Sequence, residues 1–274
     1  MMTIGVRAHD FGRQEPDSLG ACIKAAGFNC TQLAPAKAIT GISHFNDITD
    51  YHIDSCQRAF AAHDVEIAVL GCYIEPALAD RIQRLEQVEI FKKNLTYATK
   101  LGTDIVGTET THLDINCTTT QRENAYQLLK DSLLRMAEKA EKEQIYIGIE
   151  PVAEHTLNTV EITQRLLEEV NCKWVKIIFD PVNLVLPSTI NNQAQIFANM
   201  LTYLGSHIVA MHIKDIAIEN GKKVWRNIGA GLIDYGPIIT WLKANKPHMP
   251  LLREGVAMDS YKKDLQAMEN LVVG

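Results

Sequence analysis

Short apolar runs alternate with longer amphipathic stretches along the whole chain. Several runs are rich in Val and Ile, which is typical of strands that are buried on both faces of a parallel sheet. The pattern predicts eight strands, at residues 3–8, 30–34, 65–71, 104–108, 145–150, 174–180, 208–213 and 250–254.

Between these runs, apolar residues recur at helical spacing. Two helix starts carry a capping-box pattern, in which a polar residue is followed three positions later by Glu: Thr120 with Glu123, and Asn158 with Glu161. We expect a helix after each of these starts. Further helices are expected at 17–27, 79–101, 191–205, 235–245 and 258–271, and one more between 45 and 63.

Eight alternations of strand and helix in 274 residues predict an α/β fold of the (β/α)₈ TIM-barrel class, as a single domain over residues 1–274. The alternative is an open doubly wound sheet. A dinucleotide-binding sheet carries G-x-G-x-x-G after its first strand, but that position reads "VRAHDFGRQE" here. No G-x-x-x-x-G-K-[ST] motif occurs either, so the pattern favours the barrel.

Composition narrows the class of protein. Hydrophobic residues make up 46% and charged residues 22%, as in soluble globular proteins, and the net charge is −6 without a block of Lys or Arg. This argues against nucleic-acid binding, which needs a basic face. The sequence shows no signal-peptide or membrane-spanning pattern, and its six cysteines form no C-x-x-C pair. We therefore expect a cytoplasmic protein with reduced thiols and no membrane partner.

Four residues suited to metal binding follow one another at predicted strand ends: Glu150, Asp180, His212 and Glu254, on strands five to eight. The carboxyl ends of barrel strands meet at one rim, where barrel enzymes have their active sites. Three carboxylates gathered there would repel one another unless a cation lay among them. Three oxygen donors and one imidazole suit a single Mn²⁺, Mg²⁺ or Co²⁺ ion, and can also hold Zn²⁺.

Each of these residues also has a purely structural interpretation. Asp180 could cap the segment that follows it, and Glu150 could be a loop carboxylate. His212 could be a hydrogen-bonded core histidine, and Glu254 could pair with its neighbour Arg253. The joint occurrence at four successive strand ends favours a shared metal site. Lys214 could steer an anionic group or pair outward with Asp215.

Several segments resemble the xylose-isomerase-like barrel superfamily of sugar isomerases and epimerases. They are "GIEPVAEHT", "FDPVN", "MHIKD" and "NIGAGLIDYGPIITWL", in the same order as in that family. In its ketose epimerase branch, the resemblance places metal ligands at the positions of Glu150, Asp180, His212 and Glu254. The G-x-G-x-x-D segment at Gly229, Gly231 and Asp234 is interpreted as a tight turn before a helix.

The chain also departs from that family. Asn183 stands where many members have a histidine that helps to hold substrate oxygens, and Ile216, Ala217 and Ile218 occupy the stretch where ketose epimerases have an arginine. These departures bear on the identity of the substrate more than on the metal. The residues expected to contact substrate are Asn183, His9, Glu109, His112 and Glu154.

The resemblance implies a divalent-metal-dependent sugar isomerase or epimerase that acts on a small ketose, aldose or related polyol ketone. Glu150 and Glu254 would be both ligands and bases in a proton abstraction through a metal-bound enediolate. A lyase similar to inosose dehydratase is the main alternative. A phosphodiesterase similar to endonuclease IV would need an Asp-x-His motif where Lys223 and Trp225 stand, and a histidine where Asn183 stands. A non-catalytic sugar-binding barrel would be expected to have lost ligands. A homo-oligomer is compatible with this sequence.

Overall fold

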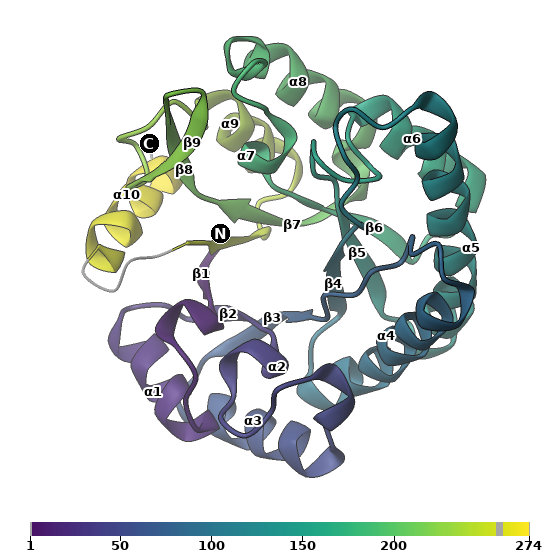
Figure 1. The fold of residues 1–274 in the computed structure, drawn as a ribbon. Coiled ribbons are helices and arrows are strands. Elements are labelled where there is room, and N and C mark those ends of the chain that lie inside the picture. Colours follow the sequence, from purple (N-terminus) through teal and green to yellow (C-terminus); the bar gives the residue numbers. More distant parts are fainter. Residues whose placement is uncertain (1, 256–259, 274) are drawn as a thin grey trace.

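Eight parallel strands form a closed barrel in the order β1-β10-β7-β6-β5-β4-β3-β2 (Figure 1). The computed structural model describes residues 2–255 and 260–273. Each strand lies where an apolar run predicted it, to within one residue at either end, which confirms the TIM barrel. The strands are β1 (Thr3–Arg7), β2 (Cys30–Leu33), β3 (Glu66–Gly71), β4 (Ile105–Glu109), β5 (Tyr146–Glu150), β6 (Val175–Phe179), β7 (Ile208–Ile213) and β10 (Pro250–Arg253).

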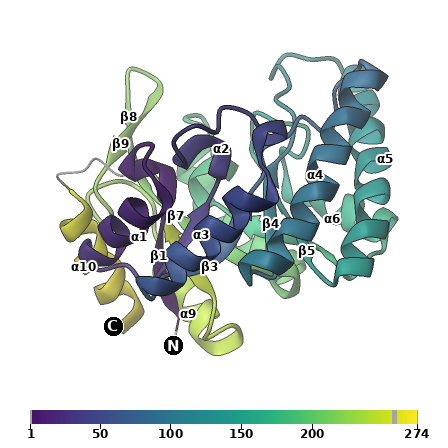
Figure 2. The ribbon, with the colours of Figure 1, turned by 90° about the horizontal axis from the view of Figure 1, so that it is seen from below.

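Helices surround the barrel and cover the outer faces of its strands (Figures 1 and 2). The longer ones are α1 (Pro16–Ala25), α3 (Asp50–Ala62), α4 (Arg81–Leu101), α5 (Thr119–Glu143), α6 (Val160–Val170), α8 (Gln193–Asn199), α9 (Gly236–Asn245) and α10 (Tyr261–Val273). A π-helical turn, η4 (Met200–Leu204), continues α8. Residues 258 and 259, where the last helix was expected to begin, lie outside the described residues.

Two predicted helix starts are shifted. The capping box of α5 is formed by Thr118 and Gln121, two residues before the expected pair. Three consecutive threonines make both registers fit the pattern, and the helix uses the earlier one, which adds helical hydrogen bonds. In α6 the cap is Thr159, whose side chain accepts from the N–H of Ile162, and not Asn158.

Two short helices follow barrel strands directly. They are α2 (Pro35–Ala38), after β2, and α7 (Pro181–Leu184), after β6. Both begin with proline, which suits the first position of a helix because its missing N–H would have no partner there. The proline after Asp180 therefore ends strand β6 and begins a helical turn, which leaves Asp180 at the junction.

A hairpin not expected from the sequence lies between β7 and the segment leading to α9. Its strands are β8 (Asp215–Glu219) and β9 (Lys222–Arg226), paired antiparallel. Asn220 and Gly221 join them with φ angles of 50° and 72°, as in a two-residue hairpin turn. Figure 2 shows the hairpin rising above the end of the barrel opposite to the N-terminus.

The turn before α9 is built around a buried carboxylate. Asp215 is 1% exposed and accepts hydrogen bonds from the N–H groups of Gly229 and Gly231, each at 3.0 Å. A Cβ atom on Gly231 would lie 2.1 Å from Oδ1 of Asp215, so this close approach requires glycine. The G-x-G-x-x-D segment is thus a turn in the structure, and Asp234 accepts from the N–H of Gly236 at its end.

The core has two layers. A small cluster fills the inside of the barrel: Cys30, Ala68, Val69, Ile105, Ile178, Ala210 and Leu252. Ile178 packs against Gly148, where an added Cβ would lie 2.9 Å from its Cγ1. A much larger cluster lies between the strands and the helices. The barrel interior is therefore packed with side chains, which confines the chemically useful space to its ends.

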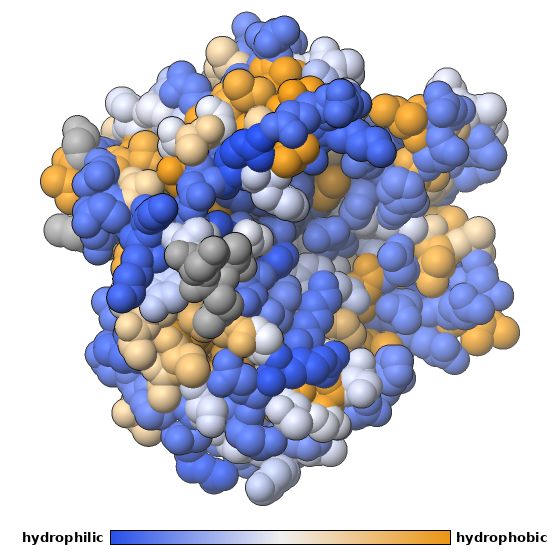
Figure 3. Space-filling model, turned by 60° about the vertical axis from the view of Figure 1, so that its left-hand side comes forward, coloured by the Kyte–Doolittle hydropathy of each residue, from blue (hydrophilic) through white to orange (hydrophobic). Residues whose placement is uncertain are grey.

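The molecular surface mixes polar and apolar side chains. The face in Figure 3 is mainly hydrophilic, with apolar patches between the polar residues. All six cysteines are free thiols. Among the described helices, none combines the length and the apolar content that a membrane crossing requires.

Candidate metal centre

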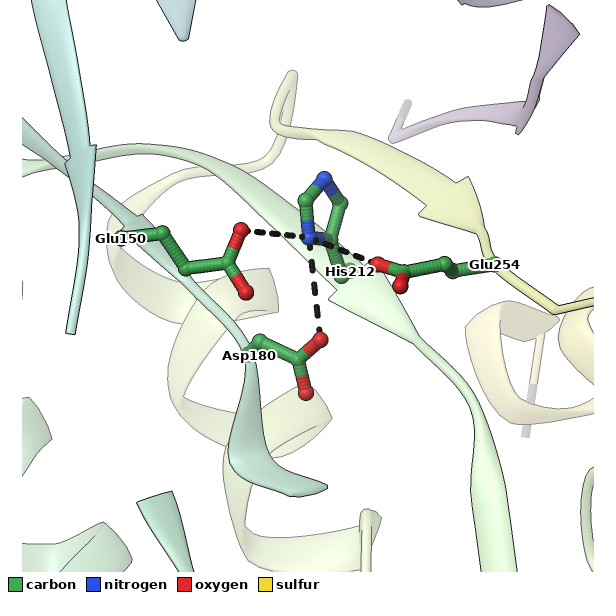
Figure 4. A group of neighbouring side chains, drawn as sticks. All are labelled: Glu150, Asp180, His212 and Glu254. Atoms are coloured by element: carbon green, nitrogen blue, oxygen red, sulfur yellow. Dashed lines mark ion pairs between the residues drawn. The ribbon is translucent and has the colours of Figure 1, made fainter. Parts of the chain in front are cut away.

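Four side chains from neighbouring barrel strands converge on one point (Figure 4). Glu150 is the last residue of β5, Asp180 follows β6, His212 lies on β7, and Glu254 follows β10. Their strands are consecutive around the barrel. The structure thus brings together all four residues that the sequence predicted as ligands, at the carboxyl ends of the strands.

His212 lies at the middle of this group. Its Nδ1 is 3.2 Å from Oε2 of Glu150, 3.7 Å from Oδ2 of Asp180 and 3.2 Å from Oε2 of Glu254. One potential ligand atom from each residue lies within 4.8 Å of all the others. Ligands held about 2.1 Å from a common ion lie at most about 4.2 Å apart, so a small contraction would suffice for binding.

The burial of these side chains and a ring nitrogen without a hydrogen-bond partner also fit a bound cation. Glu150, Asp180 and His212 are at most 2% exposed. Nδ1 of His212 is buried without a hydrogen-bond partner among the described residues, although three carboxylate oxygens surround it. A buried nitrogen with this surrounding is well placed to give its lone pair to an ion. The residues present therefore fit one divalent metal ion.

Two cations stand beside the carboxylates. The side chain of Lys214 is 3% exposed, and its Nζ lies 2.6 Å from Oδ2 of Asp180 and 3.1 Å from Oε1 of Glu254. Arg7 donates to the same Oε1 of Glu254 at 2.8 Å and also pairs with Asp10. Lys214 therefore faces the site, and Asp215, its alternative partner, is used in the turn described above.

These charges shift the pKa values of the cluster. Burial alone would raise the pKa of Glu254, but Lys214, His212 and Arg7 outweigh it and lower the pKa to about 2. Burial likewise opposes the charge on His212, yet the carboxylates, Glu150 first, raise its pKa to about 10. Without a metal, the protonated imidazole and the ammonium group of Lys214 supply the positive charge that three carboxylates require.

Two of the expected substrate residues lie beside the cluster. Asn183, on α7, donates from its side-chain amide to Oε1 of Glu150, and its backbone N–H donates to Oδ1 of Asp180 at 3.1 Å. Glu109 ends β4 and is paired with Glu150 in the sheet. Burial, followed by repulsion from Glu150 and Glu254, raises the pKa of Glu109 to about 7.

The other three expected substrate residues are His9, His112 and Glu154. His9 packs edge-on against Tyr73, with ring centroids 6.5 Å apart, and burial together with Arg7 and Lys37 lowers its pKa to about 3. A neutral imidazole therefore faces this region. His112 and Glu154 are exposed, and His112 packs against His155 at 5.8 Å. The structure places these two on the rim and not among the four central residues.

The sequence analysis missed two residues of the site, Arg7 and Gln32. It considered Lys214 for an anionic group or a pair with Asp215, but not as a contact of the predicted ligands. Gln32 contacts His212, and Arg7 contacts Glu254. Arg7 is the last residue of β1 and Gln32 the last but one of β2, and both are polar residues that interrupt apolar runs. That interruption is a usable signal, because the same rule identified the residues of strands five to eight.

Comparisons with known proteins agree with the fold. The chain resembles the crystal structure of 3-keto-D-glucoside 4-epimerase, YcjR, from E. coli, with a TM-score of 0.78, 17% identity and 100% of both chains covered. It also resembles a D-tagatose 3-epimerase-like protein, with a TM-score of 0.79, 17% identity and 99% and 97% of the two chains covered. For the IOLI protein with a bound zinc atom, the TM-score is 0.74 and the identity 16%, over 99% and 98% of the chains.

No curated protein sequence matches this chain. Residues 21–271, which are nearly the whole chain, match the family described as "Xylose isomerase-like TIM barrel". That match covers all barrel strands but β1, and it includes the four converging side chains. This protein belongs to the xylose isomerase-like TIM barrel family.

Proposed function

We propose that this protein is a divalent-metal-dependent isomerase or epimerase of a small ketose, aldose or related polyol ketone. The observation that carries the proposal is the buried convergence of Glu150, Asp180, His212 and Glu254 on a single point. Of the three similar structures, one is described as a sugar epimerase, one as an epimerase-like protein and one as a protein with a bound zinc atom. These descriptions support a metal-dependent isomerase or epimerase.

Each glutamate has one oxygen directed at the centre and one directed elsewhere. Oε2 of both residues faces Nδ1 of His212. Oε1 of Glu150 accepts from Asn183, whereas Oε1 of Glu254 lies between Arg7 and Lys214. One oxygen can therefore hold the ion while the other is available for contact with a substrate proton.

A divalent ion held at this point would supply a Lewis acid for a carbonyl group and the adjacent hydroxyl. The chain itself has to remove a proton from carbon. Oε1 of Glu150 is bonded to a neutral amide and can accept a proton without leaving a cation. Oε1 of Glu254 would have to leave two cations first, which makes Glu150 the more readily available base.

Hydrogen exchange tests this chemistry. The protein, loaded with Mn²⁺ or Zn²⁺, is incubated in D₂O with a panel of ketoses, aldoses and inososes. At least one should gain deuterium next to its carbonyl. Glu150→Gln and Glu254→Gln should each slow the exchange by about 10²–10⁴-fold, since a general base is lost while an oxygen ligand remains. Glu66→Gln, at the opposite end of the barrel, is the matched control and should exchange normally.

The products separate the neighbouring reaction classes. Loss of water from an inosose, after exchange, would favour the lyase. Label moving directly between two carbons without exchange, and without an effect of either substitution, would indicate a hydride shift. Glu150 and Glu254 would then be ligands only, and the proposed proton abstraction would be wrong.

A further inference from the structure

The second ring nitrogen of His212 also has a dedicated partner. Its Nε2 lies 2.6 Å from Oε1 of Gln32, which is 1% exposed at the end of β2. Figure 4 shows this nitrogen on the side of the ring facing away from the three carboxylates. The imidazole is thus held between a potential metal ion on one side and an amide oxygen on the other.

Gln32 is itself fixed at its other end. Its Nε2 donates to the hydroxyl of Tyr73 at 2.7 Å, and Nζ of Lys37 lies 3.7 Å from the centre of the Tyr73 ring. The amide therefore uses its oxygen for His212 and its nitrogen for Tyr73. This arrangement sets the direction of the amide, because both of its ends are bonded.

The strand pairing at this position is also irregular. Between Thr31 and Gln32, the pairing of β2 with β3 skips Ala68, so β3 carries a β-bulge opposite this point. Bulges redirect side chains and are frequent next to active sites. Thr31 instead donates to the carbonyl of Val6 in the neighbouring strand. Thr31, before the irregularity, thus makes a structural hydrogen bond, whereas Gln32, after it, contacts the candidate metal centre.

We propose that Gln32 is a positioning residue for the metal centre. Its amide oxygen accepts a hydrogen bond from the N–H at Nε2 of His212, which leaves Nδ1 with a free lone pair toward Glu150, Asp180 and Glu254. This inference rests on the proposed metal-dependent function. Partners of this kind fix the tautomer and orientation of a ligating histidine, and their loss typically costs about 10–100-fold in metal affinity.

Metal affinity tests the inference without a substrate. The dissociation constant of Zn²⁺ is measured by competition with a chromophoric chelator, for the full chain and two variants. Gln32→Met has a similar shape but no acceptor, and its dissociation constant should rise about 10–100-fold. Gln32→Glu retains an acceptor, which the Tyr73 hydroxyl can satisfy by donating, and should bind at least as tightly as the unchanged protein.

Thr31→Val is the matched control. It removes a buried hydrogen bond from the adjacent residue of the same strand, and should leave the dissociation constant unchanged. A second readout is the ¹⁵N spectrum of the zinc-loaded protein, in which His212 should carry its proton on Nε2. Gln32→Met should weaken the hydrogen-bonded signal of that proton.

The outcomes are distinct. Equal zinc affinity of Gln32→Met and the unchanged protein would overturn the role of Gln32 while leaving the metal site intact. If Gln32→Met does not fold, weaker zinc binding by Gln32→Glu would overturn it instead. Failure of the unchanged protein to bind zinc, manganese, magnesium or cobalt would refute the proposed function itself.

Discussion

The two carboxylate oxygens of Asp180 have different partners. Oδ1 accepts from the N–H of Asn183 and so caps the short helix α7, while Oδ2 points to His212 and Lys214. The apolar strand β6 is therefore followed by a carboxylate that has two roles: it caps helix α7 and it is part of the candidate metal centre. The desolvation cost of this 0% exposed group is offset by these partners.

Replacing Asp180 should separate metal binding from folding. Asp180→Ala removes one ligand and also one of three mutually repelling carboxylates, so we expect loss of the bound ion with only a modest change in stability. Metal analysis of protein purified without chelator should fall from about one equivalent to near zero. Asp80→Ala removes an exposed helix-capping carboxylate from α4 that is not one of the four converging residues, and should lower stability by about 1 kcal/mol but retain the ion.

At the scale of elements, the site depends on how the last strand is tied to the last described helix. Arg253, at the end of β10, pairs with Asp264 of α10, and both side chains are at most 4% exposed. Asp264 also accepts from the N–H of Ile228 at 2.9 Å. Another N–H of Arg253 donates to the carbonyl of Glu254 at 2.6 Å. This buried pair therefore holds the backbone of one predicted ligand.

Breaking this pair should be costly. Asp264→Ala leaves the guanidinium of Arg253 buried without its partner, and should lower the free energy of unfolding by about 3–5 kcal/mol. Urea unfolding monitored by circular dichroism measures the change. Glu89→Ala, which removes an exposed pair with Lys92 on α4, should change it by less than about 1 kcal/mol. If both variants lost a similar free energy of unfolding, the buried pair would contribute no more to stability than the exposed one, and the prediction would be wrong.

At the scale of the whole molecule, the barrel brings one end of every strand to the same rim. Residues separated by about a hundred positions therefore share one site. An ion that binds only the folded chain should also stabilise the fold as a whole. At a free concentration a hundred times its dissociation constant, the gain in the free energy of unfolding is about 2.7 kcal/mol.

This linkage can be checked by thermal unfolding with and without excess chelator. The melting temperature should rise with Mn²⁺ or Zn²⁺ in the unchanged protein and return to its initial value after chelation. The same titration should leave Asp180→Ala unaffected. A shift of equal size in that variant would indicate that the metal binds elsewhere on the chain.

The acidic charge of the whole chain makes a separate prediction. With a net charge of −6, we expect no specific binding to DNA that contains abasic sites at physiological salt. A gel-shift assay measures it. Specific binding with a submicromolar dissociation constant would contradict the expectation and favour the phosphodiesterase alternative.

The sequence determined the barrel and the four central residues. Parallel strands buried on both faces are continuous apolar runs, so β3, β5 and β6 were visible as such. The carboxylates and the imidazole at their ends then followed from the rule that barrel sites lie there. The hairpin of β8 and β9 was missed, although Asn220-Gly221 is a strong turn signal between two short polar strands.

Tertiary structure alone decided which residues support those four. Barrel closure puts β1 beside β10, so that Arg7 reaches Glu254 across 247 positions of sequence. The bulge in β3 lies opposite Gln32, which contacts His212. The chain after β7 turns Lys214 inward, where strand alternation no longer applies. The local sequence pattern shows the periodicity of each helix or strand. Contacts between the ends of distant strands depend on barrel closure and strand register, which cannot be read from any single segment.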